Sequence, residues 1–174
     1  MPNLEWSTEL VLDLPAMDNT HREFVDLLAV VEAAEDDVLL ARWAELIDHT
    51  DDHFGREDEW MQATNFARSN CHSMQHGMVL QVMRAGLKHG QEGHLALVRQ
   101  MARELAVWFP QHASAMDAAL AKHLGSVGFD PATGQLSKPE ALPQEEIHGC
   151  GGSTCSDNPA PPDQALAEAE AAVH

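Results

Sequence analysis

Seven side chains of the types that bind metal ions recur at short, regular spacings in the first 125 residues. Five are histidines and two are carboxylates: the lone His21, His53 with Glu57, His72 with His76, and His112 with Asp117. Imidazole nitrogens together with carboxylate oxygens suit first-row transition metals. The set is large enough for two metal ions, and we predict that all seven residues are metal ligands.

The two four-residue spacings favour metal binding over an ordinary solvated face. Residues four apart are neighbours on one face of a helix, so His53 with Glu57 and His72 with His76 can each serve one site. They fall on apolar stripes, where an unpaired imidazole or carboxylate costs several kcal/mol of desolvation. His49 also lies four residues from His53, but steps of four drift about 40° around the helix. We therefore expect His49 beside the ligands or at a helix interface.

The fourth pair has a different spacing. Five residues along a regular α-helix correspond to a rotation of about 140°, so His112 and Asp117 would not share a face. Either Asp117 swings across, or the helix is locally widened by a π-bulge near 112–117. Pro110 removes a backbone donor just before His112. We predict an irregular helix over this stretch.

Counting metal–ligand bonds indicates the kind of metal site. Five histidines, two bridging carboxylates and one bridging oxygen leave one of about twelve positions open on two roughly octahedral ions. An open position is a site for a small ligand. Neutral nitrogen ligands also favour the reduced metal ion, and this suits reversible O2 binding better than a carboxylate-rich site does.

The apolar periodicity predicts an all-α fold, an up-down-up-down four-helix bundle with an N-terminal arm. The arm covers about residues 1–16, and the first helix is expected to open near Asp18-Asn19-Thr20. The second helix is expected around residues 43–61, the third over about 68–88 and the fourth over about 94–124. Gly125 is expected to end the fourth helix. These segments define a domain over residues 1–125.

Residues 126–174 are expected to form a flexible acidic tail. They hold 8 acidic and 1 basic side chains, a net charge of −7, and several prolines. His148, Cys150 and Cys155 are too few for a structural zinc site. They are either two exposed thiols beside a histidine, or a reversible disulfide or metal-handling segment.

Composition narrows the partners and the compartment. A net charge of −18 repels phosphate backbones and anionic membrane surfaces, so we expect neither nucleic acid nor a membrane as partner. The N-terminus has no signal-peptide pattern, and three cysteines do not make a disulfide framework. We expect a cytoplasmic protein; a monomer is compatible with the sequence, which leaves the oligomeric state open.

Over about residues 6–124 the chain resembles the hemerythrin family in its bacterial form. The resemblance rests on Trp6, Met17-Asp18-x-x-His21, His53-Phe54-x-x-Glu57, His72-x-x-x-His76 and Trp108-x-x-x-His112-x-x-x-x-Asp117. It implies a four-helix bundle holding two non-haem iron ions, bridged by oxo or hydroxo, that bind O2. It also implies that His72, His76 and His112 hold the coordinatively full iron, that His21 and His53 hold the other, and that Glu57 and Asp117 bridge them.

One departure from the family concerns the ligand pocket. The family usually has bulky apolar residues directly after the fourth-helix histidine, where this chain has Ala113-Ser114. We expect a smaller, slightly polar lining that admits water and hastens autoxidation.

The leading interpretation is an oxygen carrier, store or sensor and not an enzyme. The alternatives are a di-iron enzyme that reduces peroxide or nitric oxide, and a regulatory module that acts through its tail. No general acid–base residue beyond the ligands is evident in the sequence, so the enzyme stays second.

Overall fold

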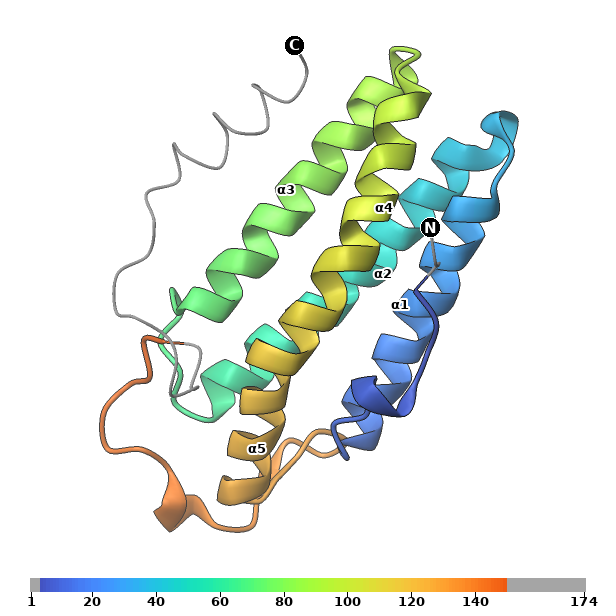
Figure 1. Cartoon of the computed structure of the whole chain (residues 1–174). Helices are drawn as coiled ribbons and strands as arrows, with labels where there is room; N and C mark the ends of the chain where they lie inside the picture. Colours follow the sequence, from blue (N-terminus) through green and yellow to red (C-terminus); the bar gives the residue numbers. More distant parts are fainter. Residues whose placement is uncertain (1–3, 150–174) are drawn as a thin grey trace.

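The computed structural model describes residues 4–149 of the chain. Four long helices pack side by side (Figure 1). They are α1 Pro15–Ala33, α2 Asp36–Ala63, α3 Cys71–Gln91 and α4 Leu95–His112. Consecutive helices contact each other, and α1 also contacts α4, so the helices close into a bundle. The predicted helical bundle is confirmed.

Local chemistry sets where the helices begin. α1 starts at Pro15, earlier than predicted, because the fixed φ and missing N–H of proline suit the first turn. The carboxylate of Asp18 is used elsewhere: it accepts a hydrogen bond from the backbone N–H of Leu12, at 2.7 Å, and so holds the N-terminal arm. α3 starts later than predicted, at Cys71, because the Asn70 side chain accepts from the backbone N–H groups of the first turn.

The last long helix is irregular at the predicted place. α4 is followed without a break by the five-residue π-helix η2, Ala113–Asp117, and then by α5, Ala118–Val127. The π-bulge expected between His112 and Asp117 is therefore confirmed. The helix passes Gly125 and ends at Gly128, which adopts the left-handed conformation with φ of 63°. The predicted end at Gly125 was wrong by three residues.

Two hydrophobic cores occupy the bundle. The larger one is built around Phe24, Trp43, Leu46, Met83 and Phe109. The smaller one lies towards the lower end in Figure 1 and consists of Met17, Met61, Phe66, Leu120, Leu124, Val127 and Phe129. Along α1, α2 and the last long helix, the predicted metal ligands lie between the residues of the larger core and those of the smaller one.

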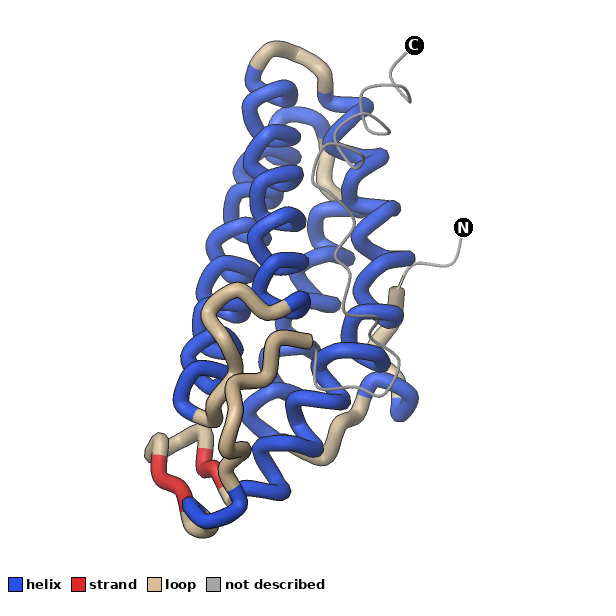
Figure 2. Tube along the Cα trace, turned by 90° about the vertical axis from the view of Figure 1, so that its left-hand side faces the viewer, coloured by secondary structure: helices blue, strands red, loops and turns tan. Residues whose placement is uncertain are grey.

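The chain after the bundle has a defined path as far as Gly149. A short antiparallel hairpin, β1 Phe129–Asp130 and β2 Gln135–Leu136, lies at one end of the bundle (Figure 2) and is followed by the 3-10 turn η3, Pro139–Ala141. Ile147 then forms a β-bridge with Phe66 in the α2–α3 link. The expectation of a flexible tail from residue 126 is therefore wrong for 126–149, because apolar side chains of this stretch pack on the smaller core.

Cys150 and Cys155 lie outside the described residues. Within residues 4–149, none of the helices is both long enough and apolar enough to cross a membrane.

Candidate metal centre

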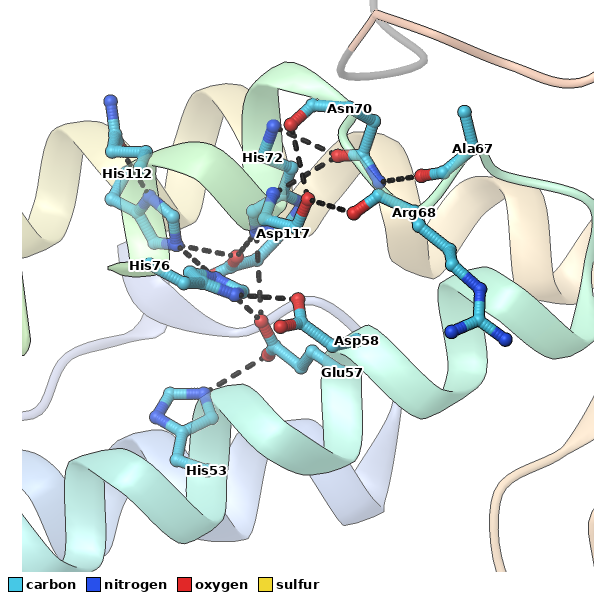
Figure 3. A network of polar contacts seen from close by, with 12 residues as sticks. His53, Glu57, Asp58, Ala67, Arg68, Asn70, His72, His76, His112 and Asp117 are labelled. Carbon is cyan, nitrogen blue, oxygen red and sulfur yellow. Dashed lines mark hydrogen bonds and ion pairs between the residues drawn. The ribbon is translucent and has the colours of Figure 1, made fainter. Parts of the chain in front are cut away.

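The fold brings the seven predicted ligand residues together in the interior. They come from α1 (His21), α2 (His53, Glu57), α3 (His72, His76), the end of α4 (His112) and the last residue of η2 (Asp117). None of the seven side chains is more than 3% exposed. Figure 3 shows six of them converging from α2, α3 and the α4–η2 helix.

Each carboxylate lies between two groups of histidines. Oε1 of Glu57 is 3.0 Å from Nε2 of His53, and its Oε2 is 3.4 Å from Nε2 of His76. Oδ2 of Asp117 is 3.1 Å from Nε2 of His21, whereas its Oδ1 is 3.0 Å from Nε2 of His112. Each carboxylate therefore directs one oxygen toward each histidine group.

The donor atoms are close enough to surround metal ions. One group has ligand atoms that all lie within 4.8 Å of one another, from Glu57, His72, His76, His112 and Asp117. A second group meets the same criterion with His21, His53 and Glu57. Glu57 belongs to both groups, as a bridging ligand would.

The ring nitrogens indicate that a cation belongs in this space. Nδ1 of His76 lies 3.0 Å from a carboxylate oxygen of Asp58, and Nδ1 of His112 lies 2.6 Å from the amide oxygen of Gln75. Since both acceptors require a proton on Nδ1, the neutral rings turn the lone pairs of their Nε2 atoms toward each other, at 3.3 Å. Two lone pairs at this distance repel each other unless a proton or a metal ion lies between them.

Several further buried polar atoms lack a well-directed hydrogen bond among the described residues, although some of them lie within ion-pair distance of one another. They belong to five of the seven residues: both ring nitrogens of His21 and His72, Nδ1 of His53, Oε2 of Glu57, and both carboxylate oxygens of Asp117. Buried polar groups in folded proteins are nearly always paired, and an unpaired one costs about 1–3 kcal/mol. Metal ions would satisfy most of these atoms, so the cluster fits a metal centre.

Both carboxylates are held in the charged form. Burial and the charge of Asp117 act to raise the pKa of Glu57, but His53 and His21 outweigh them and hold this pKa well below its usual range. Burial likewise acts to raise the pKa of Asp117, and His112 leads the interactions that hold it well below its usual range. Glu57 and Asp117 are therefore anionic at neutral pH, as the predicted carboxylate ligands would need to be.

Two of the histidines hold protons in the metal-free chain. Burial acts to lower the pKa of His21, but Asp117 and Glu57 outweigh it and raise the pKa to about 9. Burial is again the largest effect on His76, and Asp58 and Glu57 outweigh it to raise that pKa to about 9. Protons thus occupy positions that a metal ion would take, because the carboxylates attract positive charge.

Aromatic rings hold the histidine rings in place. Phe54 stacks on His76, with ring centroids 3.9 Å apart and planes 4° apart. Trp108 stacks on His112 at 4.5 Å. The edge of Phe109 meets His21 at 5.1 Å. These contacts restrict ring rotation and keep water from the cluster.

His49, Ala113 and Ser114 lie close to predicted ligands in the sequence, but the structure gives them different surroundings. His49 is at a helix interface, where its Nε2 lies 3.2 Å from the Thr20 carbonyl oxygen of α1. Ala113 is buried, but Ser114 is exposed and donates to the Gln111 carbonyl oxygen. The expectation that Ser114 gives the pocket a polar lining is therefore wrong, because the π-helix turns this side chain to the surface.

Sequence reasoning missed Asp58 and Gln75, which accept the hydrogen bonds from His76 and His112. Each directly adjoins a predicted ligand in sequence. Their signal was weak, because a polar residue on the outer side of an amphipathic helix is expected without any function.

The fold and the cluster define a helical-bundle protein with a buried set of histidines and carboxylates that is able to hold metal and suits iron. A family model described as the hemerythrin HHE cation binding domain matches residues 12–124. A bacteriohemerythrin of Ralstonia nicotianae is 38% identical over 131 residues, which cover 75% of this chain and 95% of that protein. The chain therefore belongs to the hemerythrin family. No solved structure matches it significantly.

Proposed function

We propose that this protein holds two non-haem iron ions and binds O2 reversibly, as a carrier, store or sensor. The observation that carries the proposal is the placement of Glu57 and Asp117, each of which directs one oxygen toward each of two histidine groups. A site for one ion needs no such sharing. A pair of ions does, because carboxylates that bridge them hold the ions at a fixed separation.

The two ends of the cluster offer different numbers of protein ligands. Three histidines serve one iron, namely His72, His76 and His112. Two histidines serve the other, His21 and His53. The end with fewer protein ligands is the one at which we expect O2 to bind. When present, the iron pair supplies the two electrons that reversible O2 binding requires.

The surroundings support binding more than turnover. Phe109 is buried with its ring against His21, and Ala113 belongs to the same hydrophobic core. On the other side of this end, the ring of His49 lies 6.2 Å from that of His53. The apolar wall beside His21 limits the access of water to bound O2. Membership in the hemerythrin family also favours a binding protein over an enzyme. A cytoplasmic location is compatible with this role and stays a prediction.

Anaerobic reconstitution tests the proposal. Chain loaded with Fe(II) is exposed to O2 and then returned to an O2-free atmosphere, while visible spectra and the iron content per chain are recorded. We expect two irons per chain and repeated, reversible colour changes. Chain loaded with redox-inert zinc is the control and stays colourless.

Two results would contradict the proposal at different points. One iron per chain would exclude the dinuclear site. Two irons with a single irreversible oxidation would keep the site and exclude reversible O2 binding, and would favour peroxide or nitric oxide chemistry.

A further inference from the structure

The outer face of α3 carries an apolar stripe in contact with solvent. Met74, Met78 and Val82 follow one another at steps of four and are 43%, 45% and 46% exposed. They lie on the same face of the helix, away from the buried His72 and His76. Three large apolar side chains in one row on a surface helix indicate a face that is covered by another segment or molecule.

The charge of α3 differs from that of the whole protein. Its 21 residues include no aspartate or glutamate, whereas the chain has a net charge of −18. Arg84 and Lys88 lie on the helix beyond the stripe, and Arg84 also pairs with Asp51 of α2 at 2.7 Å. An acidic partner that is repelled by most of the molecular surface is tolerated on this face.

The described chain ends beside the first turn of α3. The backbone N–H of Cys71 donates to the His148 carbonyl oxygen at 3.2 Å, and Ile147 bridges to Phe66 just before it. Residues 150–174 follow directly from this point. An extended chain spans about 3.3 Å per residue and a helix rises about 1.5 Å per residue. Residues 150–163 are thus long enough to reach any part of α3.

The sequence of 164–173 matches the stripe in pattern and charge. Five of its seven apolar residues share one face of a helix, Ala165, Leu166, Ala169, Ala172 and Val173, whereas Ala167 and Ala171 lie off that face. Glu168 and Glu170 are its charged residues, and residues 150–174 contain no lysine or arginine. Ten helical residues extend over about 15 Å, close to the roughly 12 Å from residue 74 to residue 82.

We propose that residues 164–173 dock as an amphipathic helix on the outer face of α3. Leu166 and Val173 cover the stripe of Met74, Met78 and Val82. Glu168 and Glu170 then lie beside α3, which carries no acidic side chain. The binding surface is then an internal one, for a segment of this same chain. The proposal is independent of the metal content and of O2 binding.

Methionine labelling of the full-length, iron-loaded protein tests the docking. A methionine-selective oxaziridine modifies accessible thioethers, and mass spectrometry of peptides gives the rate at each position. Leu166→Glu places a charge in the apolar face. We expect it to raise the labelling rates of Met74 and Met78 about threefold or more, as when a mostly docked population is released. Met116, which lies on η2, is the internal reference and should not change.

Ala167→Glu is the matched control, because it adds the same charge on the opposite face of the predicted helix. Its labelling rates should equal those of the unchanged chain. Equal rates in all three proteins would overturn the proposal. Protection that rises with protein concentration, together with a dimer in sedimentation, would also overturn it, because a second copy of the chain would then cover the stripe.

Discussion

At the scale of single residues, the site depends on two carboxylates shared by five histidines. Glu57 and Asp117 are fully buried, and each is charged because histidines surround it. Burial of charge is costly without compensation. His21 and His76 supply part of that compensation through protons in the metal-free chain, and metal ions would supply the rest.

Replacing Glu57 by glutamine tests its shared role. Glu57→Gln keeps the shape of the side chain and removes its charge and one acceptor oxygen. We expect the iron content to fall from two ions to at most one per chain, as measured by elemental analysis. Glu59→Gln makes the same change on an exposed side chain of the same helix and should keep both irons. Full iron in Glu57→Gln would show that the bridge is dispensable.

The raised pKa values of His21 and His76 predict that metal binding releases protons. With pKa values of about 9, both rings are protonated at pH 7 in the metal-free chain, and a histidine must lose this proton to coordinate a metal ion. Metal affinity should therefore rise with pH from 7 to about 9 and then level off. Titration calorimetry in two buffers of different ionisation enthalpy should detect about two protons released at pH 7. No release at pH 7 would contradict these pKa values.

The same shifts predict how pH changes the stability of the metal-free chain. A pKa raised above the unfolded value of 6.5 stabilises the fold fully below pH 6.5, and this contribution is lost as the pH rises through about 9. The midpoint of urea unfolding should therefore fall between pH 7 and pH 10. An unchanged midpoint would show that the two rings are not protonated in the folded protein.

At the scale of secondary-structure elements, the π-helix η2 reconciles a five-residue spacing with a single site. A regular helix would turn His112 and Asp117 apart, but here Oδ1 of Asp117 is 3.0 Å from Nε2 of His112. The sequence was sufficient to predict this irregularity, because helical geometry is local. It was not sufficient to predict which side chains η2 turns outward, such as Ser114, because that depends on how α4 packs against the other helices.

Deleting Ser114 should leave the site intact. The deletion brings the histidine and the aspartate to a spacing of four, and this places them on one face of a regular α-helix. Deleting Val107, also exposed, rotates the preceding part of α4 by about 100° relative to His112. We expect iron to be retained in the first variant and lost in the second. Equal loss in both would show that the π-helix itself is required.

At the scale of the whole molecule, residues 143–149 hold the α2–α3 link just before the predicted ligands of α3. Asn65 donates from its side-chain amide to the Pro143 carbonyl oxygen at 2.7 Å, and its own carbonyl accepts from the backbone N–H of Ile147 at 2.9 Å. Asn65 has a φ of 74°, in the left-handed region. These contacts join the end of the described chain to the link between α2 and α3.

Substitutions at Asn65 should separate its two roles. Asn65→Ala loses the side-chain hydrogen bond and keeps a strained backbone, so the free energy of unfolding should fall by about 1–2 kcal/mol. Asn65→Gly loses the same bond but adopts positive φ easily, so its loss should be smaller. Urea unfolding of the metal-free chain measures both. Asn19→Ala, on the exposed face of α1, is the control and should cause no loss. A larger loss for glycine than for alanine would contradict this account.

The sequence by itself determined the helical bundle, the residues expected to bind metal and the irregular stretch in the fourth helix, because helical periodicity and spacing are local properties. Only the tertiary structure decided how Glu57 and Asp117 direct their oxygens, and that Asp58 and Gln75 orient His76 and His112. It also placed residues 126–149 against the bundle, where local composition had predicted a loose tail. These features depend on contacts between residues far apart in the chain, such as Phe66 with Ile147, and no local pattern encodes such contacts.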